Sequence, residues 1–145
     1  MTSVKWEAGN YTTVATTALN SLADSGQAAS DEINNSDDLY LFDDVELYTG
    51  VFGVAPSAGA VVELYAVLAD LDGTGYEDGE SVAPPASNLV GVFNIRAVTN
   101  AQTHVLRHVP IPPSKFKYVV MNKTGQAFAS SGNTLRRRPY RYQSG

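Results

Sequence analysis

The feature that most constrains this chain is an unbroken stretch of strand-forming residues at its centre, from Ala60 to Leu68. Read with a period of two, the residues at even positions from 62 to 68 form one apolar face, whereas the opposite face is mixed. This alternation, rich in β-branched residues and free of Gly and Pro, predicts a β-strand with one buried side. Such a strand is unstable alone, so the rest of the chain should supply a second layer to cover it.

Further strand signals follow at short, even spacing. The segment 39–48 is a second strong strand, in which Asp43 interrupts an apolar face and the Asp43–Asp44 pair can mark a β-bulge. Other strands are expected around 93–97, 105–109, 116–120, 127–129 and 134–138, with a weak strand in 12–22 and room for one helical turn at 28–33. About eight strands with turn residues between them and almost no helix are typical of a sandwich or barrel. We therefore predict an all-β, jelly-roll-like antiparallel β-sandwich over residues 14–138, with an extended N-terminal arm (1–13) and C-terminal arm (139–145).

Composition excludes several kinds of protein. The chain has no cysteine, which excludes disulfide cross-links and thiolate metal sites. No apolar run approaches the ~18–20 residues that a membrane-spanning helix needs, and the N-terminus lacks the apolar core of a signal peptide. We expect a soluble protein that is not exported by the Sec route and has no membrane partner.

The net charge of −5 hides a strong asymmetry along the chain. All 15 acidic residues lie between Glu7 and Glu80, whereas nine of the ten Lys and Arg residues follow Glu80. Two interpretations are open. Strands from the two halves could interleave and cancel the charge, or separate acidic and basic surfaces could favour head-to-tail self-association.

The segment after the central strand is the one candidate metal site. Its residues follow the ligand spacing of a calcium loop at Asp70, Asp72, Thr74 and Asp78, with Gly75 at the sixth position. However, the twelfth position is Ser81 instead of Glu, and the loop follows a strand and not a helix. A glycine-rich turn with solvated carboxylates explains the same residues. These four residues therefore form a weak calcium candidate, and no cofactor is expected.

No catalytic arrangement emerges from the residues. Asp43 and Asp44 would point to opposite faces of a regular strand, so they are a poor catalytic dyad. His104 and His108 would lie ~13 Å apart along a strand, too far to share a zinc ion. We expect the protein not to be an enzyme.

The C-terminal segment is basic and interleaved with aromatic residues, in the order Arg136, Arg137, Arg138, Pro139, Tyr140, Arg141 and Tyr142. This pattern suggests nucleic-acid binding, but the acidic remainder of the chain would repel phosphates. The same residues also fit a final edge strand (134–138) followed by an arm. Docking of that arm on an acidic protein neighbour is the favoured interpretation, and direct nucleic-acid binding is not expected.

Several segments resemble small virion structural proteins of tailed bacteriophages, and are similar to capsid decoration (cement) proteins. They are VELY (62–65), DGTGYEDG (72–79), FNIRAVT (93–99), IPPSKFK (111–117) and NKTGQAFASSGNTL (122–135). The resemblance covers roughly residues 12–142. It implies a jelly-roll body on the outer surface of a capsid, made in the host cytoplasm, with extended termini that lock neighbouring subunits. It also implies no catalysis and no cofactor.

The expected partners in this picture are the major capsid protein and further copies of the chain. A homo-oligomer is expected, with a trimer on local three-fold axes as the favoured form. Interface energy concentrates in aromatic and Arg side chains, so the predicted contact residues are Trp6, Tyr11, Arg136, Arg137, Arg138, Tyr140, Arg141 and Tyr142. Two alternatives stay open: a neck, tail or fibre-base component of the virion, and a carbohydrate-binding β-sandwich module.

Overall fold

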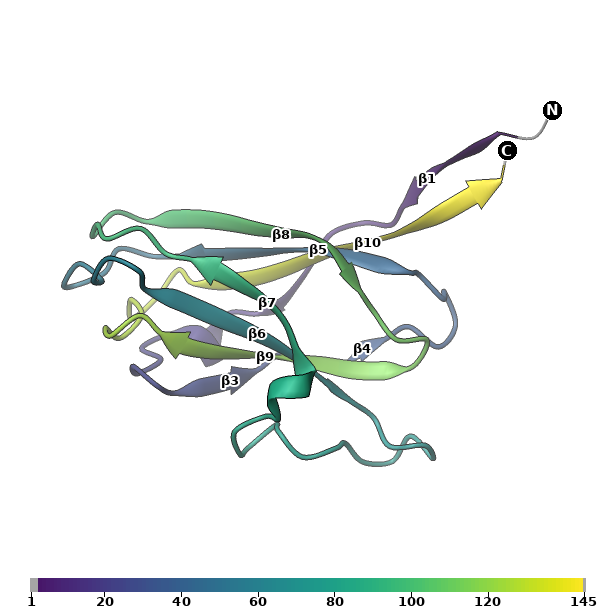
Figure 1. Cartoon of the computed structure of the whole chain (residues 1–145), viewed down its shortest axis with the longest axis horizontal. Helices are drawn as coiled ribbons and strands as arrows, with labels where there is room; N and C mark the ends of the chain where they lie inside the picture. Colours follow the sequence, from purple (N-terminus) through teal and green to yellow (C-terminus); the bar gives the residue numbers. More distant parts are fainter. Residues whose placement is uncertain (1–2, 145) are drawn as a thin grey trace.

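The computed structural model describes residues 3–144, which form ten β-strands and two short 3₁₀ helices (Figure 1). The strands are β1 (Val4–Ala8), β2 (Thr12–Ala15), β3 (Gln27–Ala29), β4 (Ile33–Asn34), β5 (Phe42–Thr49), β6 (Val61–Leu68), β7 (Leu89–Asn94), β8 (Gln102–Pro110), β9 (Lys115–Lys123) and β10 (Thr134–Ser144). The helices are η1 (Thr17–Leu19) and η2 (Ala86–Asn88). Neither helix of this described part is long and apolar enough to cross a membrane.

The strands form two antiparallel sheets that stack as two layers (Figure 1). Sheet A has the order β1-β10-β5-β8, with β2 also paired with β10. Sheet B has the order β3-β9-β6-β7, with β4 also paired with β9. The predicted jelly-roll-like antiparallel β-sandwich is therefore confirmed.

The core lies between the two sheets and follows the period-two pattern of the sequence. Val62 and Leu64 of β6 are fully buried, as are Phe116 and Tyr118 of β9 and Leu47 of β5. The strand predicted at the centre of the chain lies between β7 and β9, inside sheet B. Leu68, predicted on the same buried face, is instead exposed because it lies at the end of β6.

A second, smaller apolar cluster covers the outer face of sheet B. It consists of Tyr65, Val67, Val119 and Met121, with Tyr76 packed against it. Tyr76 belongs to the long segment 69–88, which Gln27 holds on the sheet. The Gln27 Nε2 lies within hydrogen-bond distance of three carbonyl oxygens of that segment, and the nearest is that of Val82 at 2.9 Å. The face of β6 that looked mixed in the sequence is therefore partly covered by the chain's own loop.

Three local expectations are wrong. Residues 28–33 form no helical turn, because β3 and β4 pair with β9 there. Residues 127–129 form no strand: they follow a turn in which the Asn122 side chain donates to the Gln126 carbonyl at 2.8 Å. The strand expected at 134–138 is not at an edge, because β10 lies between β2 and β5. All three features depend on side-chain hydrogen bonds or on pairing between strands far apart in the sequence, and neither leaves a periodic signal in the sequence.

The two terminal segments pair with each other. The boundaries predicted at 13/14 and 138/139 fall inside β2 and β10. Residues 140–144 of β10 pair with β1, and beyond Tyr140, which also pairs with β5, they continue past the body of the sandwich. We call β1 and residues 140–144 the terminal ribbon; Figure 1 shows it projecting away from the body of the sandwich, and Val4 lies opposite Ser144 at its far end.

The ribbon begins where Gly9 crosses Pro139. Pro139 has no amide hydrogen, and its carbonyl accepts a hydrogen bond from the Gly9 amide at 2.8 Å. A Cβ at position 9 would lie 2.9 Å from the Tyr40 hydroxyl and 3.0 Å from Pro139 Cγ. Only glycine fits this crossing without a shift of its neighbours, and here β10 passes from β2 to β1.

Candidate binding surface at the base of the terminal ribbon

Strand alternation gathers aromatic side chains on the outer face of sheet A, where the ribbon leaves the body. Trp6 lies directly opposite Tyr142, and Tyr140 lies opposite Phe42. Together with His108 of β8 these residues form an aromatic cluster. The ring centroids of Phe42 and His108 are 3.8 Å apart in a stacked pair, and those of Trp6 and Tyr142 are 4.7 Å apart.

A β-bulge turns His108 into this cluster. Asp43 pairs with Val109, but Val45 pairs with Leu106, so two residues of β8 lie opposite Asp44. The irregularity predicted at Asp43–Asp44 is confirmed, although the extra residue belongs to β8. His108 takes a positive φ of 61°, and its ring Nδ1 lies 2.8 Å from the Tyr140 hydroxyl.

The Asp44 carboxylate holds the bulge in place. It accepts a hydrogen bond from the backbone N–H of His108 at 3.2 Å. It also contacts the guanidinium groups of Arg107 at 3.3 Å and Arg138 at 3.1 Å. A single carboxylate thereby aligns two arginines and one histidine on the same face.

The four predicted arginines all contact carboxylates of their own chain. The pairs are Arg136–Glu46, Arg137–Asp43 at 2.8 Å, Arg138–Asp44 at 3.1 Å and Arg141–Glu7 at 2.7 Å. β10 lies between β5, which supplies three of these carboxylates, and β1, which supplies Glu7. Within sheet A the two halves of the chain therefore interleave, and each arginine of β10 is paired with a carboxylate from the acidic half. The Arg141 side chain, which donates to Glu7, lowers the pKa of that carboxyl.

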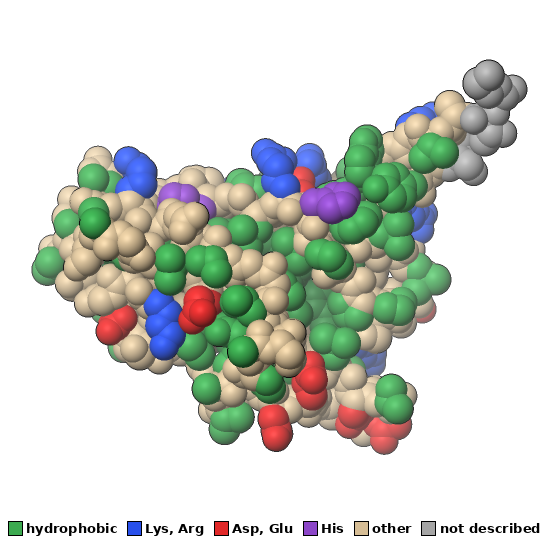
Figure 2. All heavy atoms as spheres, in the orientation of Figure 1, with side chains coloured by type: hydrophobic (Ala, Val, Ile, Leu, Met, Phe, Trp, Pro, Cys, Tyr) green, Lys and Arg blue, Asp and Glu red, His purple; other side chains and the backbone are tan. Residues whose placement is uncertain are grey.

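Two neighbouring hollows extend the surface along the sheet. One, of about 330 Å³, is lined by Tyr11, Glu46 and Arg136 among others. The second, of about 350 Å³, is lined by Trp6, His108 and Tyr140 among others. Asp44, Arg107 and Arg138 line both hollows. Figure 2 shows hydrophobic side chains gathered where the ribbon meets the body.

We call the combined feature the aromatic–arginine surface. Its residues are Trp6, Tyr11, Phe42, Asp44, Arg107, His108, Arg136, Arg138, Tyr140 and Tyr142. Six of the eight predicted contact residues therefore lie together. The sequence does not predict four members of this surface, Phe42, Asp44, Arg107 and His108. A bulge brings Asp44, Arg107 and His108 together, and the only sequence signal for that bulge is the adjacent pair Asp43–Asp44.

Arg137 and Arg141, the other two predicted contact residues, point to the opposite face of β10. Arg137 reaches into the core, where Asp43 is fully buried and accepts a hydrogen bond from the Tyr118 hydroxyl at 2.5 Å. Burial raises the pKa of Asp43, although Arg137 and Tyr118 act in the opposite direction. Arg141 instead lies over the ring of Tyr40, 5.1 Å from its centroid. Arg137 also lines the first hollow, but its guanidinium group is turned toward Asp43 in the core, and Arg141 lines neither hollow.

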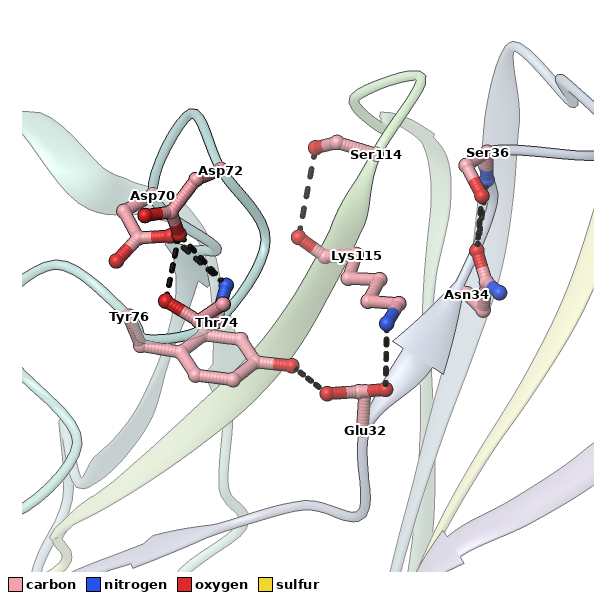
Figure 3. A network of polar contacts seen from close by, with 9 residues as sticks. All are labelled: Glu32, Asn34, Ser36, Asp70, Asp72, Thr74, Tyr76, Ser114 and Lys115. Carbon is pink, nitrogen blue, oxygen red and sulfur yellow. Dashed lines mark hydrogen bonds and ion pairs between the residues drawn. The ribbon is translucent and has the colours of Figure 1, made fainter.

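The candidate calcium residues belong to the segment 69–88, outside sheet A, and Figure 3 shows three of them, Asp70, Asp72 and Thr74. The Asp72 carboxylate accepts hydrogen bonds from the amide and the hydroxyl of Thr74, at 2.9 and 2.6 Å. Asp70 accepts from the same amide at 3.1 Å. The segment is also tied to Glu32, which accepts from the Tyr76 hydroxyl and lies 3.9 Å from Lys115 Nζ. Across residues 3–144, no group of three or more His, Cys, Asp or Glu side chains is arranged to hold a metal ion.

The aromatic–arginine surface is suited to binding by contact. Aromatic rings and Arg stems offer apolar area, while the guanidinium groups and Asp44 offer directional hydrogen bonds. Trp6 and Tyr142 remain 58% and 49% exposed despite their mutual contact, which leaves apolar area for a partner.

Comparisons with known proteins identify no family. No protein-family model matches the sequence, and no curated protein matches it either. Among solved structures, one from Sulfurospirillum deleyianum is similar at 8% identity and a TM-score of 0.48, covering 91% of this chain and 97% of that one. Desmodium yellow mottle tymovirus is similar at 12% identity and a TM-score of 0.38, covering 100% of this chain and 89% of that one. A third similar structure comes from work on carbohydrate-binding modules of the β-sandwich superfamily. It has 10% identity and a TM-score of 0.37, covering 97% of this chain and 56% of that one. Likenesses this distant carry no conclusion about function.

Proposed function

We propose that this protein is a virion structural protein that decorates the outer surface of a bacteriophage capsid. It would bind the major capsid protein and neighbouring copies of itself through the terminal ribbon and the aromatic–arginine surface. The class of protein in this proposal rests on the sequence resemblance to capsid decoration proteins. The observation that carries the proposal is the ribbon, which projects from the body with Val4, Trp6 and Tyr142 exposed at 70%, 58% and 49%.

An exposed apolar ribbon is costly unless a partner covers it. A two-stranded ribbon alone is marginally stable in water, and interface energy concentrates in aromatic and Arg side chains that become fully buried on binding. Both residue types are enriched here on one face. A decoration protein stabilises an assembled lattice because it binds the lattice and not the free subunit.

The test is the number and place of copies on a particle. The purified protein is mixed with candidate empty phage capsids and imaged by electron cryo-microscopy. Hundreds of symmetric copies on the outer shell would support the proposal. Density at a single vertex or on the tail would overturn it in favour of a neck, tail or fibre-base station, and no density would overturn the virion proposal for those capsids.

A matched pair of variants connects that result to the surface. Trp6→Ala combined with Tyr142→Ala should weaken particle binding at an unchanged melting temperature. Tyr48→Ala is the control, because Tyr48 is an exposed tyrosine on the same face of sheet A but at the opposite end of β5. Equal loss of binding in both proteins would mean that the aromatic–arginine surface is not the contact.

A carbohydrate-binding module is a second candidate, favoured by the aromatic cluster beside two hollows that contain Asp44 and arginines. Aromatic faces bordered by planar polar groups suit the stacking of a sugar ring. Trp6 is the only tryptophan of the chain, so its fluorescence reports directly on binding at this place. A saturable change with an oligosaccharide, absent in Tyr142→Ala, would support this candidate.

A further inference from the structure

The outer edge of β1 carries backbone groups that are not paired with another strand among the described residues, where β1 pairs with β10 alone. The Gly9–Pro139 hydrogen bond fixes the phase of that pairing. In an antiparallel ladder, opposite residues alternate between hydrogen-bonded and non-hydrogen-bonded pairs. Lys5 and Glu7 therefore direct their N–H and C=O groups to β10, whereas Val4, Trp6 and Ala8 direct theirs to the open edge.

We propose that this edge pairs antiparallel with β1 of a second copy of the chain, about a two-fold axis at Trp6. The contact joins two terminal ribbons into one four-stranded sheet, in the order β10-β1-β1-β10. This β1–β1 contact would be the contact between neighbouring copies in the proposed function, and its biological role rests on that function. A two-fold contact of this kind is self-complementary, because each pair of residues off the axis occurs twice.

The charges of β1 select this register. With the axis at Trp6, Lys5 lies opposite the partner's Glu7 on both sides of the axis. Moving the axis to position 5 would place two lysines opposite each other, and moving it to position 7 would place two glutamates opposite each other. Like charges directly opposite are destabilising in a sheet. A Lys on an edge strand normally discourages pairing, but here this one register gives it an acidic partner.

Backbone pairing is complete in the same register. Val4 lies opposite the partner's Ala8, and Trp6 lies opposite the partner's Trp6. All three residues that direct their backbone groups to the open edge are therefore used. Each is on the face that also holds Tyr140 and Tyr142, so the apolar face of one ribbon continues into the other.

The shape of the molecule leaves room for this contact. The ribbon projects from the body with β1 running from the tip at Val4 to the base at Ala8 (Figure 1). Antiparallel pairing places the two bodies at opposite ends of the joined ribbons, so the sandwiches do not compete for space. Because each chain uses its ribbon for one neighbour, the contact can also link chains that belong to different three-fold groups.

A charge exchange in the full chain tests the register. Lys5→Glu brings two carboxylates opposite each other on both sides of the axis, and Glu7→Lys brings two ammonium groups opposite each other there. Sedimentation equilibrium should show wild-type protein doubling in mass with concentration, and each variant alone associating at least about tenfold more weakly. An equal mixture of the two variants restores opposite charges on both sides of the axis and should regain association. Failure of the mixture to associate would overturn the register.

A cysteine at the axis gives a second readout. Trp6→Cys introduces the only thiol of the chain, next to its own copy across the axis, where hydrogen-bonded strand partners lie ~5.5 Å apart at Cα, within disulfide reach. Mild oxidation should give a covalent dimer. Leu71→Cys, at a fully exposed position on the segment 69–88, is the control for random collision. Equal cross-linking of the two variants would overturn the contact.

These measurements separate the inference from the function. A protein that is monomeric at every concentration but binds capsids would refute the ribbon contact and leave the proposed function standing. A protein that forms the predicted dimer but binds no capsid would support the contact and refute the function.

Discussion

At the residue scale, the most constrained group is the buried trio of Asp43, Arg137 and Tyr118. It joins the two layers, because Asp43 and Arg137 belong to sheet A and Tyr118 belongs to sheet B. Arg137 lies 2.8 Å from both carboxylate oxygens, though only its Nε makes a hydrogen bond, to Oδ2. A buried pair adds little net stability by itself, but losing one partner leaves an uncompensated charge in the core.

Arg137→Met should therefore destabilise the fold by about 3–5 kcal/mol near neutral pH. Burial raises the pKa of Asp43 in the folded protein above its unfolded value. The stability from this group is complete below the unfolded pKa and is lost as pH rises through the folded pKa. Without Arg137 the stability lost on raising the pH is larger. The difference in free energy of unfolding between Arg137→Met and wild type should therefore shrink in acid. Urea denaturation at neutral and acidic pH measures this difference. Arg138→Met, at an exposed position, is the control. A stability loss of Arg137→Met that grows in acid would contradict this prediction.

At the element scale, the terminal ribbon is separate from the core. None of residues 3–13 belongs to the buried cluster between the sheets, and β1 is mostly exposed. β10, by contrast, provides the buried Leu135 and lies inside sheet A. The two strands of one ribbon therefore contribute very differently to stability.

Deleting residues 1–8 should lower the melting temperature by no more than about 4 °C, which corresponds to ~1 kcal/mol for a domain of this size. The same deletion should abolish the β1 contact between copies. Differential scanning calorimetry and sedimentation equilibrium measure the two effects on one sample. Cooperative loss of the whole sandwich would show that β1 is part of the folding unit.

Hydrogen bonds between its own residues hold the turn at the start of the segment 69–88. Asp70 and Asp72 already accept hydrogen bonds from Thr74, which also lowers the pKa of Asp72. We therefore expect the same melting temperature in millimolar calcium and in a chelator. A rise of several degrees with calcium, lost in Asp72→Asn, would instead establish the calcium loop.

How far the sequence predicts the structure depends on the range of each interaction. Val62 and Leu64 were placed correctly because a period of two reports directly on a buried face. The ribbon was missed as a paired element because the contact between Trp6 and Tyr142 joins opposite ends of the chain. The site was found only in part for the same reason: aromatic and Arg side chains stand out in a sequence, but the β8 bulge that brings His108 to Phe42 depends on strand register, which no local pattern encodes.

At the scale of the whole molecule, the sheets are joined by one apolar core in which β6 is central. Leu64 is fully buried in that core, so Leu64→Ala should cost about 2–5 kcal/mol through lost burial and cavity formation. The slope of unfolding against urea should stay unchanged, because the sandwich unfolds as one unit. Leu71→Ala, at a fully exposed position, should stay within about 0.5 kcal/mol of wild type. A loss below ~1 kcal/mol for Leu64→Ala would mean that the layers do not depend on β6 for their packing, and a changed slope would mean that the two sheets can separate before they unfold.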